Sequence, residues 1–199
     1  MEQFFFIIII SFILLLFYKR NLIIKKNDNL IKEKSQLDGE TYKVLNKSDS
    51  IKTANILSKI KKNFTIIVND LNINIKKYPK KEYAIKNLVN RTKNLEITER
   101  PDDSDDYITS YTLNKGELMV ICLRAKFLRT VHDFNIIFYV CIHELAHIAS
   151  NNIGHDEEFE SNFKFLLKEA IRLNLYIPVD YRKTPADYCG IKVDEYLLD

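Results

Sequence analysis

The sequence predicts an α+β fold in which a small sheet packs against helices, preceded by an N-terminal transmembrane helix. Apolar residues recur at helical spacing from Ile51 to Leu71, and two runs rich in β-branched and aromatic residues flank the turn-like Asn114-Lys115-Gly116-Glu117. The first residues include fifteen uncharged positions, 4–18. Helices, strands and one membrane segment are therefore expected in a chain of 199 residues, a length that suits one globular domain.

The composition excludes several classes of protein. The chain has only 4 Gly and 4 Pro, too few for a collagenous or low-complexity protein, and its 3 Cys cannot all pair as in a disulfide-built mini-protein. The formal net charge is +3, and no basic run is interleaved with aromatic residues. Nothing in the sequence therefore indicates a nucleic-acid partner.

The apolar segment Phe4–Tyr18 is interpreted as a single-pass membrane anchor, which takes residues 1–24 once it is extended through Ile24. Fifteen helical residues span about 22 Å, and the extension reaches the roughly 30 Å of a hydrocarbon core. An acid rather than a base precedes the segment and no small-residue cleavage site follows it, which argues against a cleaved signal peptide. The positive-inside bias places the rest of the chain in the cytosol because bases follow the segment: Lys19, Arg20, Lys25, Lys26, Lys32 and Lys34.

Residues 25–50 are polar, charged and without periodicity, which predicts a linker before a domain at 51–199. Within that domain we expect a helix over 51–71, a short helix after Pro79, a solvated loop at 101–106 and a β-hairpin made by 107–113 and 118–123. The second hairpin strand is either a sheet edge that could receive an extended peptide or an ordinary core strand.

Two helices are expected near the end of the domain. Asp133 is suited to cap a helix over 134–150, which is apolar on almost every side and must therefore be buried. Asn151, Asn152 and Gly154 favour its end. Asp156 is suited to cap the next helix, whose apolar stripe comprises Phe159, Phe163, Leu166, Leu167, Ala170 and Ile171.

The buried helix contains the pattern His-Glu-X-X-His at His143, Glu144 and His147. Residues four apart lie on one helical face, so the two imidazoles can share one Zn²⁺ ion. A catalytic zinc site takes one more protein ligand and one water. Glu144 is then placed to act as general base on that zinc-activated water. The alternative is a pair of core histidines with Glu144 at a helix rim, which would bury three polar groups at a cost.

His155 is the preferred third ligand because it follows Gly154 directly after the helix ends, where the chain can return over the two histidines. Glu158 and Glu169 on the following helix are competing carboxylate ligands. His132 stands at the other end of the long helix, about 16 Å from His143, and is interpreted as part of a cap.

The stretch HELAHIASNNIGHDEEF, starting at His143, resembles the metal-binding core of the SprT/WLM-like zinc metallopeptidases, which are small zincins. The resemblance covers 133–175 and extends through the hairpin to about residue 107. It implies a small sheet against an active-site helix, with His143, His147 and His155 as zinc ligands and Glu144 as general base. The Ile-, Lys- and Asn-rich chain is also similar to uncharacterised proteins of large DNA viruses.

Three further residues have a functional and a structural interpretation. Tyr181 or Tyr188 could donate a hydrogen bond to an oxyanion beside the metal, although core or surface positions are the commoner roles of tyrosine. Cys189 could bind the zinc as an inhibitory thiolate. Because Cys122 and Cys141 lie in apolar runs, we expect all three cysteines to be reduced, cytosolic thiols.

The sequence thus predicts a membrane-anchored zinc metallopeptidase that acts on a protein or peptide substrate. The alternative is a membrane-tethered binding or structural protein that keeps a zincin scaffold without turnover. The intact Glu144 favours the enzyme.

Overall fold

The computed structural model describes residues 29–102 and 109–198. The predicted anchor at 1–24 and most of the predicted loop at 101–106 lie outside these ranges. In the part of the chain that is described, no helix has both the length and the hydropathy required to cross a bilayer.

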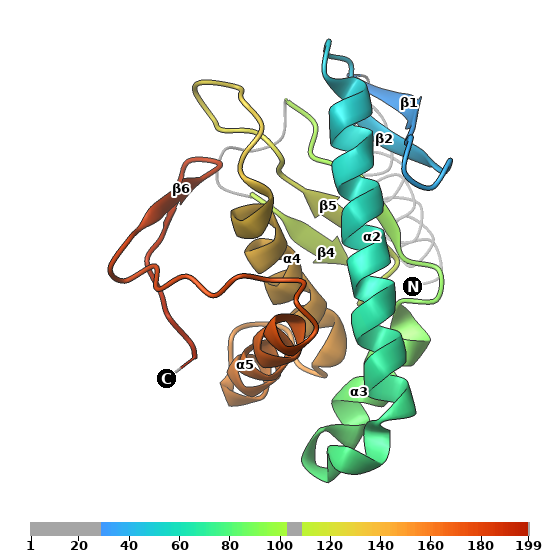
Figure 1. The fold of residues 1–199 in the computed structure, drawn as a ribbon, viewed down its shortest axis with the longest axis vertical. Helices are drawn as coiled ribbons and strands as arrows, with labels where there is room; N and C mark the ends of the chain where they lie inside the picture. The colour runs from blue at the N-terminus through green and yellow to red at the C-terminus, as the bar shows by residue number, and fades with distance from the viewer. Residues whose placement is uncertain (1–28, 103–108, 199) are drawn as a thin grey trace, which may run out of the picture.

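The described strands form a five-stranded mixed sheet in the order β1-β2-β3-β5-β4 (Figure 1). The three inner strands are parallel, and β1 and β4 pair antiparallel at the two sides. The strands are β1 Leu30–Lys34, β2 Thr41–Leu45, β3 Glu96–Glu99, β4 Tyr111–Leu113 and β5 Leu118–Ile121. With helices on the sheet, this arrangement confirms the predicted α+β class.

The prediction of a linker over 25–50 is wrong, because β1 and β2 lie in this segment. The two strands pair from Leu30 opposite Leu45 to Lys34 opposite Thr41. Only Tyr42, Val44 and Leu45 of these strands are buried. Strands of five residues with so few apolar positions show little periodicity in the sequence, and their stability comes from pairing and from packing against a distant helix.

Helices cover one face of the sheet, with α2 over β2 and β3 and α4 over β5 and β4. The helices predicted from 51–71, after Pro79, from Asp133 and from Asp156 are all present. Their bounds are α2 Ser50–Ile73, α3 Glu82–Arg91, α4 Phe134–Ala149 and α5 Glu157–Arg172, and two 3₁₀ turns, η1 Ile75–Lys77 and η2 Pro79–Lys81, join α2 to α3.

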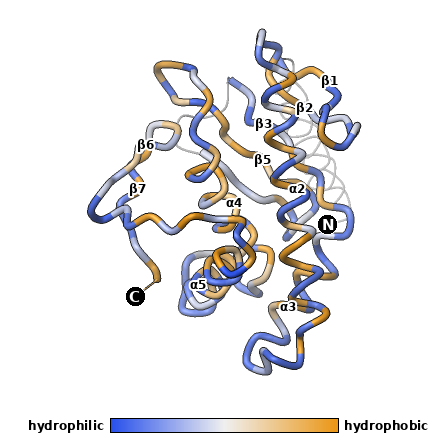
Figure 2. The backbone as a smooth tube through the Cα atoms, in the orientation of Figure 1, coloured by the Kyte–Doolittle hydropathy of each residue, from blue (hydrophilic) through white to orange (hydrophobic). Residues whose placement is uncertain are grey.

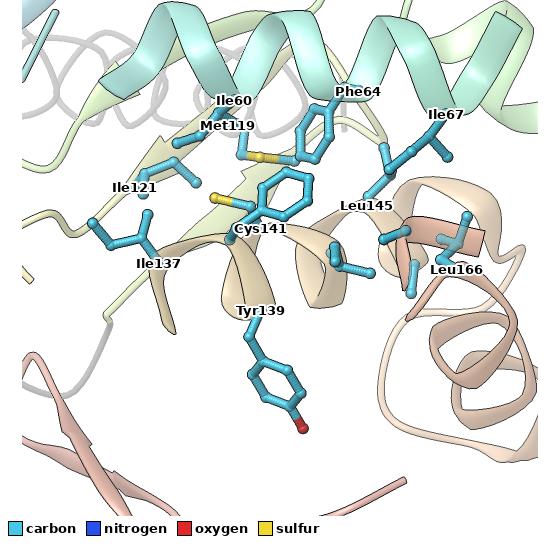
Figure 3. Close-up of a cluster of buried hydrophobic side chains, with 14 of the residues drawn as sticks. Ile60, Phe64, Ile67, Met119, Ile121, Ile137, Tyr139, Cys141, Leu145 and Leu166 are labelled. Carbon is cyan, nitrogen blue, oxygen red and sulfur yellow. The ribbon is translucent and has the colours of Figure 1, made fainter. Parts of the chain in front are cut away.

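The core lies between α2, β5 and α4. Figure 3 shows Ile60 and Phe64 of α2 facing Met119 of β5 and Cys141 of α4, with Tyr139 on the opposite side of α4. These apolar side chains are at most 3% exposed, apart from Tyr139 at 7%. In Figure 2, α4 and β5 form a largely hydrophobic centre, whereas hydrophobic and hydrophilic positions alternate along α5. The prediction that the helix from Asp133 is buried is confirmed.

The β4–β5 hairpin is also confirmed, although its edge strand is not the one considered in the sequence. β5 pairs with β3 on one side and β4 on the other, so the core-strand interpretation of the second hairpin strand is confirmed, and β4 is the outer strand at this side of the described sheet. The turn needs left-handed backbone at Asn114, Lys115 and Gly116, and a Cβ at Gly116 would lie 2.7 Å from the Arg91 carbonyl oxygen. The turn is therefore pressed against the end of α3.

The expectation of three reduced cysteines is wrong for two of them. Cys122, just after β5, forms a disulfide with Cys189 in the turn of a C-terminal hairpin, and Cys141 is a buried free thiol. The hairpin consists of β6 Ala186–Tyr188 and β7 Ile191–Val193. The two cysteines are 67 positions apart in the sequence, so their proximity depends on the fold and no local pattern predicts it.

Candidate metal centre

Three imidazoles meet beside the C-terminal half of α4. His143 and His147 project from successive turns of the helix, and His155 comes from the loop before α5. The Nε2 atom of His143 lies 3.2 Å from that of His147 and 3.1 Å from that of His155. One ligand atom from each residue lies within 4.8 Å of the other two. The structure thus brings together the three histidines considered as ligands.

The spacing of these nitrogens suits a tetrahedral metal ion. Ligands bound at about 2.0–2.1 Å to a tetrahedral Zn²⁺ stand about 3.3–3.4 Å from one another. The two nitrogen–nitrogen distances in the cluster are within a few tenths of an ångström of this value. The donor set, three imidazoles, is the one that a catalytic zinc site uses when it keeps a fourth position for water.

The competing ligands lie elsewhere. Both carboxylate oxygens of Glu158 accept hydrogen bonds from the backbone amide of Asn151, and Glu169 binds Tyr78 and Arg172. His132 lies outside the cluster, as expected, but it is not the capping residue of α4, and its Nε2 atom accepts a hydrogen bond from the backbone amide of Cys189. The cap is Asp133, which accepts a hydrogen bond from the backbone amide of Asn135.

Glu144 lies next to the cluster and is only 5% exposed. Its Oε2 atom accepts a hydrogen bond of 3.0 Å from the hydroxyl of Thr112 on β4. Burial raises the pKa of Glu144 to about 7, although the Thr112 hydroxyl acts in the opposite direction. A carboxylate that titrates near neutrality is able both to accept and to return a proton.

The same burial favours the neutral form of the histidines. It lowers the pKa of His143 to about 3, with further contributions from His147 and His155. It lowers the pKa of His147 to about 4, helped by His155 and Lys115. Both rings are therefore neutral near pH 7, and a neutral imidazole is the form that binds a metal ion.

Phe159, on the first turn of α5, contacts all three imidazoles. Its ring centroid lies 4.2 Å from that of His147, 4.7 Å from that of His155 and 4.8 Å from that of His143. The side chain is 3% exposed. From the sequence it appeared only as one member of an apolar stripe, because its contact with the histidines depends on how α5 packs against α4.

Two basic side chains hold the end of α4 and the loop that carries His155. The Lys115 ammonium donates hydrogen bonds to the carbonyl oxygens of Ser150 and Asn152, and the Arg91 guanidinium donates to those of Ile148 and Ser150. The last carbonyls of a helix lack partners within it. In this protein, groups distant in sequence satisfy them and fix the path of the loop.

An open cavity of about 450 Å³ lies over the cluster. The cavity is lined by all three histidines, by Glu144 and by residues of β4 and the following turn, including Tyr111, Thr112 and Lys115. A second cavity of about 210 Å³ lies between His143 and the C-terminal hairpin. Of these two cavities, the larger is lined by all three histidines, whereas the smaller is lined by His143 alone among them.

The other candidates have structural roles. The Tyr188 side chain is fully buried, and its hydroxyl donates to the carbonyl oxygen of Cys122 and lies 2.9 Å from the Ser110 hydroxyl. Tyr181 is buried against Tyr139. Cys189 is bound in the disulfide and has no thiolate to offer a metal. For Tyr188 and Tyr181 the core interpretation is confirmed, and the inhibitory thiolate is wrong.

No known family model matches the chain. It is 38% identical to the uncharacterized protein R325 of Acanthamoeba polyphaga mimivirus over 165 residues, which cover 83% of each protein. It is 35% identical over 69 residues to the uncharacterized protein 136R of Invertebrate iridescent virus 6, covering 34% of this chain and 38% of that protein. It is also 35% identical over 82 residues to the uncharacterized protein 042R of Invertebrate iridescent virus 3, covering 41% of this chain and 50% of that protein.

Among solved structures, the crystal structure of Wss1 from Saccharomyces cerevisiae aligns with 66% of this chain and 87% of its own, with a TM-score of 0.48 and 19% identity. The similarity to R325 is the broader one in sequence, since it extends over most of both proteins. The chain therefore belongs to the same family as the R325 protein of mimivirus.

Proposed function

We propose that the protein is a membrane-anchored zinc metallopeptidase of the SprT/WLM-like type. The observation that carries this proposal is the convergence of three imidazole nitrogens beside the buried Glu144, at one open cavity. A structural site would need a fourth protein ligand, whereas a hydrolytic site keeps that position for water. Among the described residues, the metal-binding cluster consists of these three histidines.

His143, His147 and His155 would hold the ion. When bound, Zn²⁺ supplies a Lewis acid that brings the pKa of a water molecule close to 7. Glu144 takes up the proton of the attacking water and later returns it to the leaving amine. The Thr112 hydroxyl keeps the Glu144 carboxylate on the cavity side of α4 by donating to its Oε2 atom.

The substrate in this proposal is an extended segment of a protein. β4 is one of the two outer strands of the described sheet and also lines the cavity, so a peptide that adds alongside it would pass over the histidines. Main-chain pairing of this kind recognises extended polypeptides with little regard to side chains, and it suits peptide-bond hydrolysis better than attack on a compact small molecule.

The anchor at 1–24 belongs to the same proposal and rests on the sequence. Two features favour opposite sides of the membrane for the domain. The bases after the apolar segment favour the cytosol, whereas the Cys122–Cys189 disulfide is typical of an oxidising compartment. We retain the cytosolic side as the proposal, and thiol labelling in the producing cell tests it.

The decisive experiment compares the wild type with Glu144→Gln. Glutamine keeps the size of the side chain and can still accept from Thr112, but it cannot take up a proton. The variant should retain its zinc and its fold while losing cleavage of a protein substrate panel by a factor of about 10² to 10⁴. Glu157→Gln is the matched control, because it makes the same change at an exposed residue of α5 and should leave cleavage intact.

Equal cleavage by wild type and Glu144→Gln would contradict the proposed role of Glu144. If both forms bind the same protein and neither cuts it, the chain is instead a tethered binding protein on a zincin scaffold. If the wild type carries no zinc, neither version of the proposal holds.

A further inference from the structure

The folded domain begins very close to the predicted anchor. The anchor ends at Ile24 in the sequence, and the first described residue, Asn29, already accepts a hydrogen bond from the backbone amide of Asn46. A fully extended chain advances at most about 3.3–3.6 Å per residue, so the path from Ile24 to Asn29 is no longer than about 18 Å. An anchored chain must therefore keep the Asn29 end of the domain within about 18 Å of the bilayer.

Two ion pairs connect the Asn29 end of the domain to the loop between β5 and α4. Lys47, one residue beyond Asn46, forms an ion pair of 3.0 Å with Asp102. Asp102 also forms an ion pair of 2.9 Å with Arg129, in the loop between β5 and α4. Figure 1 shows this loop and the start of α2 at the same upper end of the molecule. The loop at 125–130 thus shares the end of the domain that faces the anchor.

This loop presents two large apolar side chains to solvent. Phe127 is 85% exposed and Leu128 is 79% exposed. Hydrogen bonds within the loop hold it in shape, from the Ala125 amide to the Thr130 carbonyl at 2.8 Å and from the Arg129 amide to the Ala125 carbonyl at 3.0 Å. Both apolar residues are therefore displayed at the tip of an ordered turn, next to the bases Lys126 and Arg129.

We propose that Phe127 and Leu128 form a second membrane contact, entering the boundary between headgroups and acyl chains of an anionic bilayer. Exposed aromatic and aliphatic side chains beside a basic residue are suited to this boundary, because the apolar side chains enter the apolar layer while the charged group stays at the level of the headgroups. This inference rests on the membrane anchor of the proposed function and is independent of peptidase activity.

The contact would orient the metal cluster away from the lipid. α2 begins at the membrane end and its 24 residues extend about 36 Å to Ile73. α4 also begins near this end and carries His143 and His147 on its later turns. Substrates would then reach the cavity from the aqueous side. They would be segments of proteins that lie at some distance from the bilayer.

Tryptophan fluorescence can test the contact, because the chain contains no Trp. Leu128→Trp places a single indole at the loop tip, and Ile73→Trp places one at the far end of α2, where Ile73 is 81% exposed. Each full-length variant is reconstituted into vesicles of phosphatidylcholine and phosphatidylglycerol, with or without bromine on the acyl chains. Co-sedimentation of the protein with the vesicles tests the anchor, independently of the fluorescence.

The emission of the Leu128→Trp variant should fall about twofold or more in brominated vesicles, while that of the Ile73→Trp variant stays unchanged. A chain that sediments with the vesicles but shows no quenching at position 128 overturns the contact and leaves the anchor standing. Blue-shifted emission at position 128 without quenching also overturns it, since a protein partner or a second copy would then cover the loop. A chain that remains in the supernatant overturns both the anchor and the contact.

Discussion

The ring of Phe159 stacks on the imidazole of His147, with centroids 4.2 Å apart and planes inclined by 29°. The same ring meets His155 nearly edge to face at 80°. α5 thereby fixes the orientation of ligands that belong to α4 and to the loop between the two helices. Because His155 is exposed, this contact is an important restraint on its ring.

Replacing Phe159 by Leu should weaken zinc binding about tenfold or more while the ligands themselves remain, because second-sphere contacts orient metal ligands. A competition titration against a chromophoric chelator measures the change in Kd. Phe165→Leu is the control, since Phe165 lies on the same helix and packs against Tyr78 instead of the histidines. The same zinc affinity in both variants would show that Phe159 only fills space.

Single alanine substitutions should decide the ligand set. His143→Ala, His147→Ala and His155→Ala should each lose most of the bound zinc measured by elemental analysis of the purified protein, since three ligands leave no redundancy. His132→Ala and Glu158→Ala should keep about one zinc per chain, because neither side chain lies in the cluster. If zinc is retained in His155→Ala but lost in Glu158→Ala, the third ligand is Glu158 instead of His155.

The Thr112 side chain is predicted to act by positioning Glu144, through the hydrogen bond that its hydroxyl donates to Oε2. Thr112→Val removes the hydroxyl at nearly constant volume and should lower kcat about tenfold, with KM and zinc content little changed. Thr112→Ser should restore most of the rate, because it returns the donor to Oε2 of Glu144. A rise in KM without a fall in kcat would instead assign Thr112 to substrate binding.

The disulfide predicts a definite pattern of thiol labelling. Denatured, unreduced protein should take up one maleimide, at Cys141, and reduced protein should take up three. Cys122→Ser should lower the free energy of unfolding by up to about 4 kcal/mol, the loop-closure value for a ring of this size. Three labelled thiols in acid-trapped, unreduced cell extracts would show that the bond is absent in the cell and would favour the cytosolic side.

The ion pair between Asp49 and Arg124 predicts a pH dependence of stability. Hydrogen bonds of 2.7 and 2.8 Å from the Arg124 guanidinium hold the pKa of Asp49 below its ordinary value of 3.8. As the pH falls, the unfolded chain protonates Asp49 before the folded chain does. The stabilisation is therefore fully present above about pH 5 and is lost as the pH falls through the folded pKa.

Asp49→Asn should accordingly be less stable than wild type at pH 7, by about 1 kcal/mol for a partly exposed pair. Urea unfolding at pH 7 and near pH 3 measures the difference at each pH, and it should narrow at the lower pH. A difference that stays constant or widens on acidification would show that the carboxylate charge of Asp49 contributes little.

Local sequence chemistry accounts for part of this protein. Apolar spacing and the capping residues Asp133 and Asp156 predicted the two helices around the cluster, because helix formation and capping depend on neighbours within a few positions. The helical period alone places His143 and His147 on one face. The local patterns did not predict β1 and β2, because the stability of short strands depends on partners elsewhere in the chain.

Local patterns in the chain predict the α+β class, the long helices, the β4–β5 hairpin and the pair of histidines one helical turn apart, since all of these follow from periodicity and turn chemistry over short distances. Four contacts depend instead on the folded arrangement: His155 returns to that pair, Thr112 reaches Glu144, Phe159 contacts all three imidazoles, and Cys122 pairs with Cys189. Each of these contacts joins different elements of the chain. Their geometry therefore depends on how helices, strands and loops pack together, which no short stretch of sequence encodes.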